Sequence, residues 1–337
     1  MAHRPTAGAT TKTRYLRIED LQRLRHLTFR SRKRVEGPYA GHHTSPQRGQ
    51  SVEFNDYRQY IPGDAVTEID WKVYGRSDKL FIKLFEHHSD LTVNLLIDAS
   101  ASMAYGGAAA PGVEGAGGSL LAGVSLRGQK IRADQDQQTI DRPSKYDQAC
   151  LMAAAIAFLV TKQQDRVGFA VAQNGLHHFH RPQAAAPHLN NLLATIERVR
   201  PGGKADLAQS LRALAPRTGR KGLLVVISDL LEDQDEIMRA LTLFTHRGNE
   251  VILFQVLHAD ELRLPDLANV IFVDSETQQH LRLNVDDVVP AYEKRLKAFL
   301  GGWAAACRNR GIDYNLVSTA TAYHEAIKQY LVGRQQL

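Results

Sequence analysis

The chain has 337 residues, of which 43% are hydrophobic and 23% charged, and its formal net charge at pH 7 is +6. This composition is ordinary for a soluble globular protein, and the length suggests two or three domains. There is no run of about 18 apolar residues and no apolar signal core at the N-terminus, so we expect neither a membrane span nor a secretory signal. The two cysteines, Cys150 and Cys307, stand far apart and fit a reduced, cytoplasmic protein better than a disulfide scaffold.

The positive charge is concentrated at the N-terminus. Residues 1–34 contain ten Lys or Arg and two Asp or Glu, whereas the rest of the chain contains 32 and 34. Such an arm could bind nucleic acid or an acidic partner, or it could be a solvated helix face with a tail. We expect a disordered tail over residues 1–14, then an amphipathic helix, because Ile18, Leu21 and Leu24 recur at helical spacing among arginines.

A segment with short β-like runs follows this helix. Its central turn consists of Pro62, Gly63 and Asp64, and residues 79–86 alternate enough to form a strand of a small sheet. We group the basic helix and this β segment together as residues 15–88.

From residue 89 the predicted elements alternate between strand and helix. Strands are expected over residues 91–98, 165–173, 175–181, 221–229, 249–257, 269–277 and 312–320. Helices are expected over residues 144–163, 184–200, 206–217, 234–248, 285–311 and 322–333. Ser144 and Asp147 form a capping-box pattern at the first of these helices, and Asn174-Gly175 is a strong hairpin signal.

This alternation predicts the fold class. Alternating strands and helices form a mostly parallel α/β sheet with helices on both faces, and apolar strands fit a sheet that is buried on both sides. We expect one such domain over residues 89–335. A Gly- and Ala-rich insertion at about 106–140 interrupts it, and we expect this insertion to be disordered.

Two of the predicted strands end in an aspartate. "LLID" ends at Asp98, "VVISD" ends at Asp229, and Ser100 and Ser102 follow Asp98 at every second position. Ligands of open α/β sheets bind outside the carboxyl ends of the strands, so these side chains meet at one rim if the two strands are neighbours. Carboxylate and hydroxyl oxygens suit Mg²⁺, which also keeps several waters. The alternative is that each aspartate only caps a helix or ends a strand.

The "DASAS" motif at residues 98–102 resembles the D-x-S-x-S signature of the von Willebrand factor A domain, whose metal-ion-dependent adhesion site binds Mg²⁺ or Mn²⁺. Asp229 matches the later aspartate of that family. The stretch at residues 49–86, with "R-x-Y-x-x-G-D" and "IDW", closely resembles bacterial proteins of the domain of unknown function 58 family. The resemblance covers roughly residues 15–335. It implies a doubly wound, von Willebrand A-like domain that works with a MoxR-type AAA+ ATPase.

One position departs from the pattern that the resemblance implies. The middle metal loop of the family usually reads Gly-Gly-Thr-Asp-Leu, with the threonine hydroxyl as a ligand, but this chain has "GGKADL" at residues 202–207. Ala205 stands in the threonine position and offers no oxygen, and Lys204 adds an ammonium group nearby. Water could fill the missing position on Mg²⁺ or Mn²⁺, and Asp206 could coordinate the ion directly or through water. Alternatively, the site binds metal weakly or not at all.

A second set of candidates lies upstream of the α/β domain. Asp70, Trp71, Arg76 and Asp78 could form a partner-binding surface, since Trp and Arg are favoured at the centres of interfaces. The alternative is that Trp71 packs between the small sheet and the α/β domain, with Asp70 and Arg76 as a supporting pair.

Functions from three classes follow from these patterns. The resemblance implies a non-enzymatic adaptor or assembly factor, whose rim metal accepts a carboxylate from a MoxR-type ATPase or from a client of it. A metal-dependent hydrolase is a weaker alternative. In a phosphatase of the haloacid dehalogenase type a general acid stands two residues after the first aspartate, and here that residue is Ser100. Nucleic-acid binding rests on the basic arm alone, so we do not favour it.

Overall fold

The structure of the chain is a computed structural model, and it describes residues 14–16, 22–24, 26–29, 53–60, 69–77, 79–86, 91–106, 143–204, 206–264, 269–273 and 280–335. The chain forms two compact units, one of residues 1–33 with 91–337 and one of residues 34–90. Residues 1–13 of the predicted tail and the predicted insertion beyond Gly106 lie outside the described residues.

The larger unit is built on one six-stranded sheet. Its strands are β3 (Thr92–Asp98), β4 (Arg166–Ala172), β5 (Leu176–Gln183), β6 (Leu223–Ser228), β7 (Glu250–Leu257) and β10 (Asp313–Ser318). They lie in the order β10-β7-β6-β3-β4-β5, and all neighbours are parallel except the edge strand β5. The predicted mostly parallel α/β fold is confirmed.

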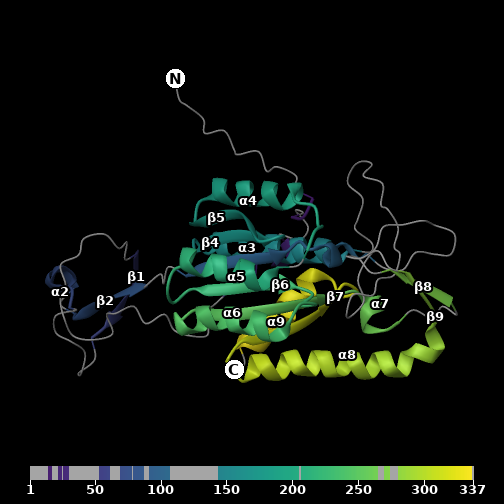
Figure 1. Cartoon of the computed structure of the whole chain (residues 1–337). Helices are drawn as coiled ribbons and strands as arrows, with labels where there is room; N and C mark the ends of the chain where they lie inside the picture. Colours follow the sequence, from purple (N-terminus) through teal and green to yellow (C-terminus); the bar gives the residue numbers. More distant parts are fainter. Residues whose placement is uncertain are drawn as a thin grey trace. The chain divides into compact units, whose positions relative to one another are not determined.

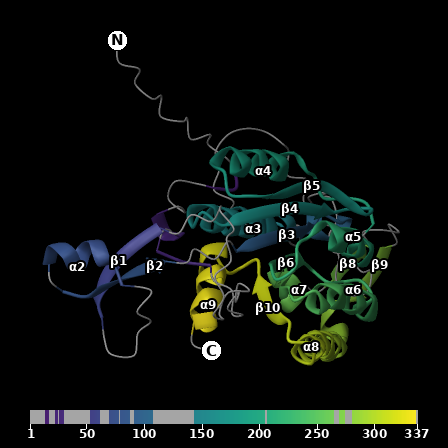
Figure 2. The same cartoon turned by 90° about the vertical axis from the view of Figure 1, so that its left-hand side faces the viewer.

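Helices cover both faces of this sheet, as Figure 1 and Figure 2 show. On one face pack α3 (Lys145–Lys162), α4 (Ala186–Arg198) and α9 (Tyr323–Gln335), and on the other α5 (Leu207–Leu214), α6 (Gln234–His246) and α8 (Val285–Arg308). Strand periodicity separates the two cores: Leu95 and Ile97 belong to the first and Leu96 to the second. None of the described helices combines the length and hydropathy needed to cross a bilayer.

Two local signals of the sequence are confirmed. The Ser144 hydroxyl accepts the N–H of Asp147 at 3.0 Å, and the Asp147 carboxylate accepts the N–H of Ser144 at 3.3 Å, so a capping box begins α3. Asn174 and Gly175 have φ of 50° and 107° and connect β4 to β5. Asn and Gly tolerate such angles, so this pair makes the tight turn of the edge hairpin.

The strand expected over residues 269–277 is not part of the main sheet. β8 (Asn269–Val273) instead pairs antiparallel with β9 (His280–Asn284) in a separate two-stranded sheet, and β9 leads directly into α8. An apolar run predicts a strand but not its partner, which explains this error. The short helix α7 (Ala259–Leu262) precedes the hairpin.

The smaller unit contains a second antiparallel pair. β1 (Glu53–Gln59) pairs with β2 (Phe81–Glu86), which confirms the strand expected near residues 79–86. The seven-residue helix α2 (Trp71–Ser77) lies between them in the sequence.

The N-terminal arm belongs to the core of the larger unit. Tyr15, Leu24 and Phe29 are buried there. The main chain of Phe29 exchanges two hydrogen bonds with the side-chain amide of Gln163, at 2.7 and 3.0 Å. The sequence grouped the basic helix with the β segment as residues 15–88, but these contacts join it to a helix about 130 residues away, which local periodicity cannot reveal.

Candidate functional site

The carboxyl ends of β3 and β6 bring the two strand-end aspartates to one rim. The strands are parallel neighbours in register at Ile97 and Ile227. Asp98 is the last residue of β3, and Asp229 directly follows β6. Their relative exposures are only 2% and 1%. The sequence therefore predicted correctly that both side chains reach the same edge of the sheet.

Hydrogen bonds fix the Asp98 carboxylate and the two serines after it. Asp98 accepts the N–H of Ser100 at 2.8 Å and the hydroxyl of Ser228 at 2.6 Å. The hydroxyls of Ser100 and Ser102 are 3.0 Å apart, and both serines are buried. Ser228 also accepts the N–H of Leu230, a buried residue with φ of 58°. The loop thus presents one carboxylate and two hydroxyls together.

Negative charge accumulates on this side of the rim. Burial, and then the charge of Asp229, raise the pKa of Asp98 from 3.8 to about 6. Burial also raises the pKa of Glu232 to about 7, with contributions from Asp98, Asp206 and Asp229, against a hydrogen bond from the N–H of Leu207. Within the described part of the chain, Asp98 forms no ion pair with a basic side chain.

The middle loop of the predicted site, which begins at Gly202, is hydrogen-bonded to the loop of residues 99–102 after β3, here called the serine loop. The N–H of Gly202 donates to the carbonyl of Ala99 at 2.9 Å, and the N–H of Ala101 donates to the carbonyl of Gly203 at 3.1 Å. Asp206 occupies the N-cap position directly before α5. Ala205 lies outside the described residues. The described part of this loop, Gly202 and Gly203, therefore contacts the segment that carries Ser100.

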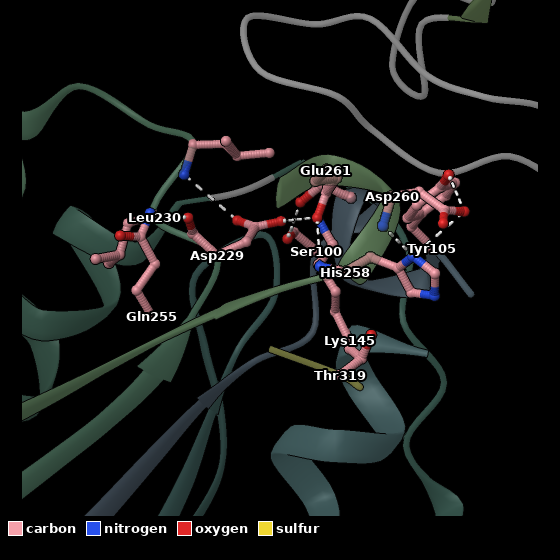
Figure 3. Close-up of polar contacts among 12 residues, drawn as sticks. Ser100, Tyr105, Lys145, Asp229, Leu230, Gln255, His258, Asp260, Glu261 and Thr319 are labelled. Carbon is pink, nitrogen blue, oxygen red and sulfur yellow. Dashed lines mark hydrogen bonds and ion pairs between the residues drawn. The ribbon is translucent and has the colours of Figure 1, made fainter. Parts of the chain in front are cut away.

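A buried lysine, absent from the sequence-based site, occupies the other side of the rim (Figure 3). The ammonium of Lys145 lies 2.8 Å from a carboxylate oxygen of Asp229 and 2.8 Å from one of Glu261. All three side chains are almost fully buried. Burial alone would lower the pKa of Lys145, but the two carboxylates raise it, so the lysine is charged. Lys145 therefore neutralises Asp229 but not Asp98.

Glu261 links this lysine to α7. Its second oxygen accepts the N–H of His258 at 2.8 Å and completes a capping box. The His258 ring packs edge-on against Tyr105, with centroids 4.9 Å apart, and the hydroxyl of Tyr105 donates to Asp260 at 3.3 Å. Figure 3 shows these residues beside Lys145. The serine loop, the start of α3 and α7 are thus connected by polar contacts.

The Asp98 side of the rim suits a hard cation. The Asp98 carboxylate and the hydroxyls of Ser100 and Ser102 are the oxygen ligands that Mg²⁺ and Mn²⁺ prefer. Among the described residues, no group of three or more His, Cys, Asp or Glu side chains is arranged to hold a metal ion. An ion at this position would therefore depend on one carboxylate, two hydroxyls and water.

The residues predicted to bind a partner lie in the smaller unit, and they differ in burial. Asp70 is buried and accepts the N–H groups of Lys72 and Val73 at 2.9 and 3.4 Å, so it caps the start of α2. Trp71 is 59% exposed. Arg76 is also exposed. Asp78 lies outside the described residues.

Comparison with known sequences identifies the family. The family described as "Protein of unknown function DUF58" matches residues 56–122 and 132–298, more than half of the chain. The chain belongs to the DUF58 family. An uncharacterized protein of Mycobacterium tuberculosis is 26% identical to this DUF58 chain over 266 residues, covering 78% of it and 73% of the relative. An uncharacterized protein of Mycobacterium avium is 33% identical over 94 residues, covering 28% and 54%.

Solved structures with similarity to this DUF58 protein include von Willebrand A domains. The conserved hypothetical protein BatB from Bacteroides thetaiotaomicron has 12% identity and a TM-score of 0.42, covering 73% of this chain and 100% of that one. The SpRpn10 VWA domain has 8% identity and a TM-score of 0.39, covering 71% and 94%. The sheet order and the two helical layers described above, rather than these scores, carry the von Willebrand A-like fold assignment.

Proposed function

We propose that this DUF58 protein is a non-enzymatic protein-interaction module whose rim holds a divalent cation. Asp98, Ser100 and Ser102 would bind Mg²⁺ or Mn²⁺ directly, and Asp229 and Asp206 would contribute through water. A carboxylate of a partner protein then takes an open position on the ion. The observation that carries the proposal is the buried Asp98 carboxylate, which lies beside two hydroxyls and, within the described chain, has no cationic partner.

Water takes the place of the ligand that Ala205 lacks. Mg²⁺ keeps several waters in most protein sites, so the loss of one hydroxyl weakens the site without abolishing it. The neighbouring residues Gly202 and Gly203 are hydrogen-bonded to Ala99 and Ala101, beside Ser100.

As partner we propose a MoxR-type AAA+ ATPase or a client of it, which this protein serves as adaptor or assembly factor in the cytoplasm. This partner is supported only by the resemblance of residues 49–86 to the DUF58 family, which implies a MoxR-type ATPase as partner. Cys150 and Cys307 are both free and buried, which suits a reducing compartment. Tyr15, Leu24 and Phe29 anchor the basic arm in the core, which favours a structural role for it over nucleic-acid binding.

A metal-dependent hydrolase is the second candidate because of Glu232. Its pKa of about 7, close to Asp98 and Asp229, is in the range of a general acid or base. However, one oxygen of Glu232 accepts the N–H of Leu207 at 2.7 Å, in the first turn of α5. This bond satisfies a helix end that has no other side-chain cap, so we assign Glu232 to capping rather than to proton transfer.

Titration calorimetry with Mg²⁺ and Mn²⁺ tests the metal site. We expect saturable binding of one ion by the wild-type protein and no binding by Asp98→Asn, which keeps the size of the side chain but removes the charge. Asp233→Asn is the matched control, since Asp233 caps α6 from an exposed position and Asn is an equally good cap. Absence of saturable binding to the wild-type protein, or equal binding by Asp98→Asn, would rule out the proposed ion site.

A surface on α2 offers a second contact for the partner. Trp71 and Tyr74 are exposed and pack edge-to-face with centroids 6.1 Å apart. Lys72 and Arg76 of the same helix, and Lys79 after it, are also exposed. Aromatic and basic side chains together suit an acidic protein surface. The proposed partner surface therefore includes Tyr74 as well as Trp71 and Arg76. Asp70 does not belong to this surface, because it is buried and caps the start of α2.

Replacing Trp71 with Ala should weaken binding of a purified MoxR-type ATPase by about 2 kcal/mol, the loss typical of an interface centre. The free energy of unfolding should change by no more than about 0.5 kcal/mol because the ring is exposed. Leu243→Ala, on the exposed face of α6, is the control and should leave binding unchanged. If a calorimetric titration gave Trp71→Ala and the wild type the same affinity for the ATPase, α2 would not be part of the interface.

A further inference from the structure

The rim has two sides that differ in how their charge is balanced. On one side the Lys145 ammonium contacts Asp229 and Glu261, both at 2.8 Å. On the other side Asp98 is bound by Ser100 and Ser228, and all its described partners are neutral donors. Two carboxylates thus share a cation that the protein itself supplies, while the third lacks one.

The position of Lys145 is unfavourable unless these carboxylates hold it there. Lys145 is the first residue of α3, and the positive end of the helix dipole disfavours a cation at a helix N-terminus. Complete burial adds a desolvation cost, which two close carboxylates can offset. Asp229 therefore has one oxygen fixed on the lysine, and its other oxygen accepts the N–H of Leu231 at 3.3 Å.

We propose that the ammonium group of Lys145 acts as a permanent cation at the rim and keeps Asp229 out of direct contact with the divalent ion. The site then holds one divalent ion, on the side of Asp98, Ser100 and Ser102. This inference rests on the proposed function, because it concerns the same ion site. It assigns Lys145 and Glu261 as positioning residues and makes Asp229 a ligand that acts through water.

As a consequence, the ion pair between Lys145 and Asp229 limits the affinity of the site for Mg²⁺. While Lys145 holds Asp229, the ion has one direct carboxylate ligand, and affinity for such ions rises with the number of charged ligands. If the lysine and Glu261 are both made neutral, the net charge of the group stays the same but Asp229 is released. The affinity for Mg²⁺ should then rise because a second carboxylate can bind directly.

The double variant Lys145→Met/Glu261→Gln tests this in a calorimetric titration with Mg²⁺. We expect Mg²⁺ binding about tenfold tighter than in the wild type. Adding Asp229→Asn to the double variant should reverse this gain. The double variant Arg212→Gln/Glu236→Gln neutralises an exposed ion pair with the same change in charge, and it should leave the affinity unchanged.

The outcomes separate the two proposals. Wild-type binding with no gain in the Lys145→Met/Glu261→Gln variant would overturn the role of Lys145 and leave the ion site intact. Binding by the variant alone would support the role of Lys145 and refute metal binding by the native rim, and binding by neither would overturn both. If the variant does not fold, Asp229→Asn decides: a loss of no more than about threefold supports the inference, and a loss as complete as that of Asp98→Asn overturns it.

Discussion

Replacing Lys145 with Met should lower the free energy of unfolding by about 3–5 kcal/mol, because it leaves Asp229 and Glu261 buried without their cation. Methionine has nearly the length and volume of lysine, so packing changes little and the loss comes from the two unpaired carboxylates. Urea unfolding followed by circular dichroism measures the change. Because two buried charges lose their partner at once, this loss should exceed that of any other single substitution proposed for the rim.

Two further variants separate the ion pairs from general effects of substitution. Lys162→Met makes the same change at the last residue of α3, which is exposed, and it should alter stability by no more than about 0.5 kcal/mol. The triple variant Lys145→Met/Asp229→Asn/Glu261→Gln makes the whole group neutral and should recover most of the loss. If Lys145→Met is as stable as Lys162→Met, the buried ion pairs do not stabilise the rim.

The second large effect is expected at Asp98, where substitution should stabilise the fold and abolish binding. The pKa of Asp98 is raised from 3.8 to about 6 in the folded protein, so its ionised form is less favourable there than in the unfolded chain. At pH 7 Asp98→Asn should therefore unfold with a free energy about 1–3 kcal/mol higher than the wild type in EDTA. Binding of Mg²⁺, and of a partner that depends on it, should be lost.

The pH dependence has a definite sign. A carboxyl group whose pKa is raised in the folded protein destabilises the fold when the pH is above that raised pKa. It has no such effect when the pH is below the pKa of the unfolded chain. The advantage of Asp98→Asn should therefore be full above about pH 6 and vanish near pH 4. Adding Mg²⁺ should stabilise the wild type alone. A variant that is less stable than the wild type at pH 7 would show that hydrogen bonds from Ser100 and Ser228 outweigh the charge.

Part of the site could be predicted because it depends on local order in the chain. Apolar strands ending in Asp98 and Asp229 were visible in the sequence, and parallel neighbours necessarily bring their carboxyl ends to one edge. The capping box at Ser144 and the turn at Asn174-Gly175 are also local patterns, and both are confirmed.

The other part depends on contacts between distant residues. Lys145 follows a helix cap, a position where a lysine is normally expected to reach solvent, and its partners lie 84 and 116 residues away. Glu261 belongs to a four-residue helix that no periodic pattern predicts. One weak indication of these contacts was present in the sequence: a lysine in the first turn of a helix is unfavourable because of the helix dipole, which suggests that acidic residues hold it there.

The aromatic residue at position 71 and the hairpin after α7 show the same limit. A tryptophan is usually well buried, and only the structure reveals that α2 leaves Trp71 exposed. Likewise, the apolar residues of β8 suit the main sheet as well as the separate hairpin with β9, because strand sequences do not specify their partners.

The burial of the N-terminal arm has a consequence for synthesis on the ribosome. Phe29 is made before the residues that contact it: Gln163, which directly follows α3, and Tyr330 on α9, whose ring centroid lies 6.3 Å from that of Phe29. In the sequence, residues 34–90, which form a unit of their own, separate the arm from these later residues. The nascent chain must therefore carry an incompletely covered apolar arm until α9 is made, which makes this arm a natural binding site for chaperones.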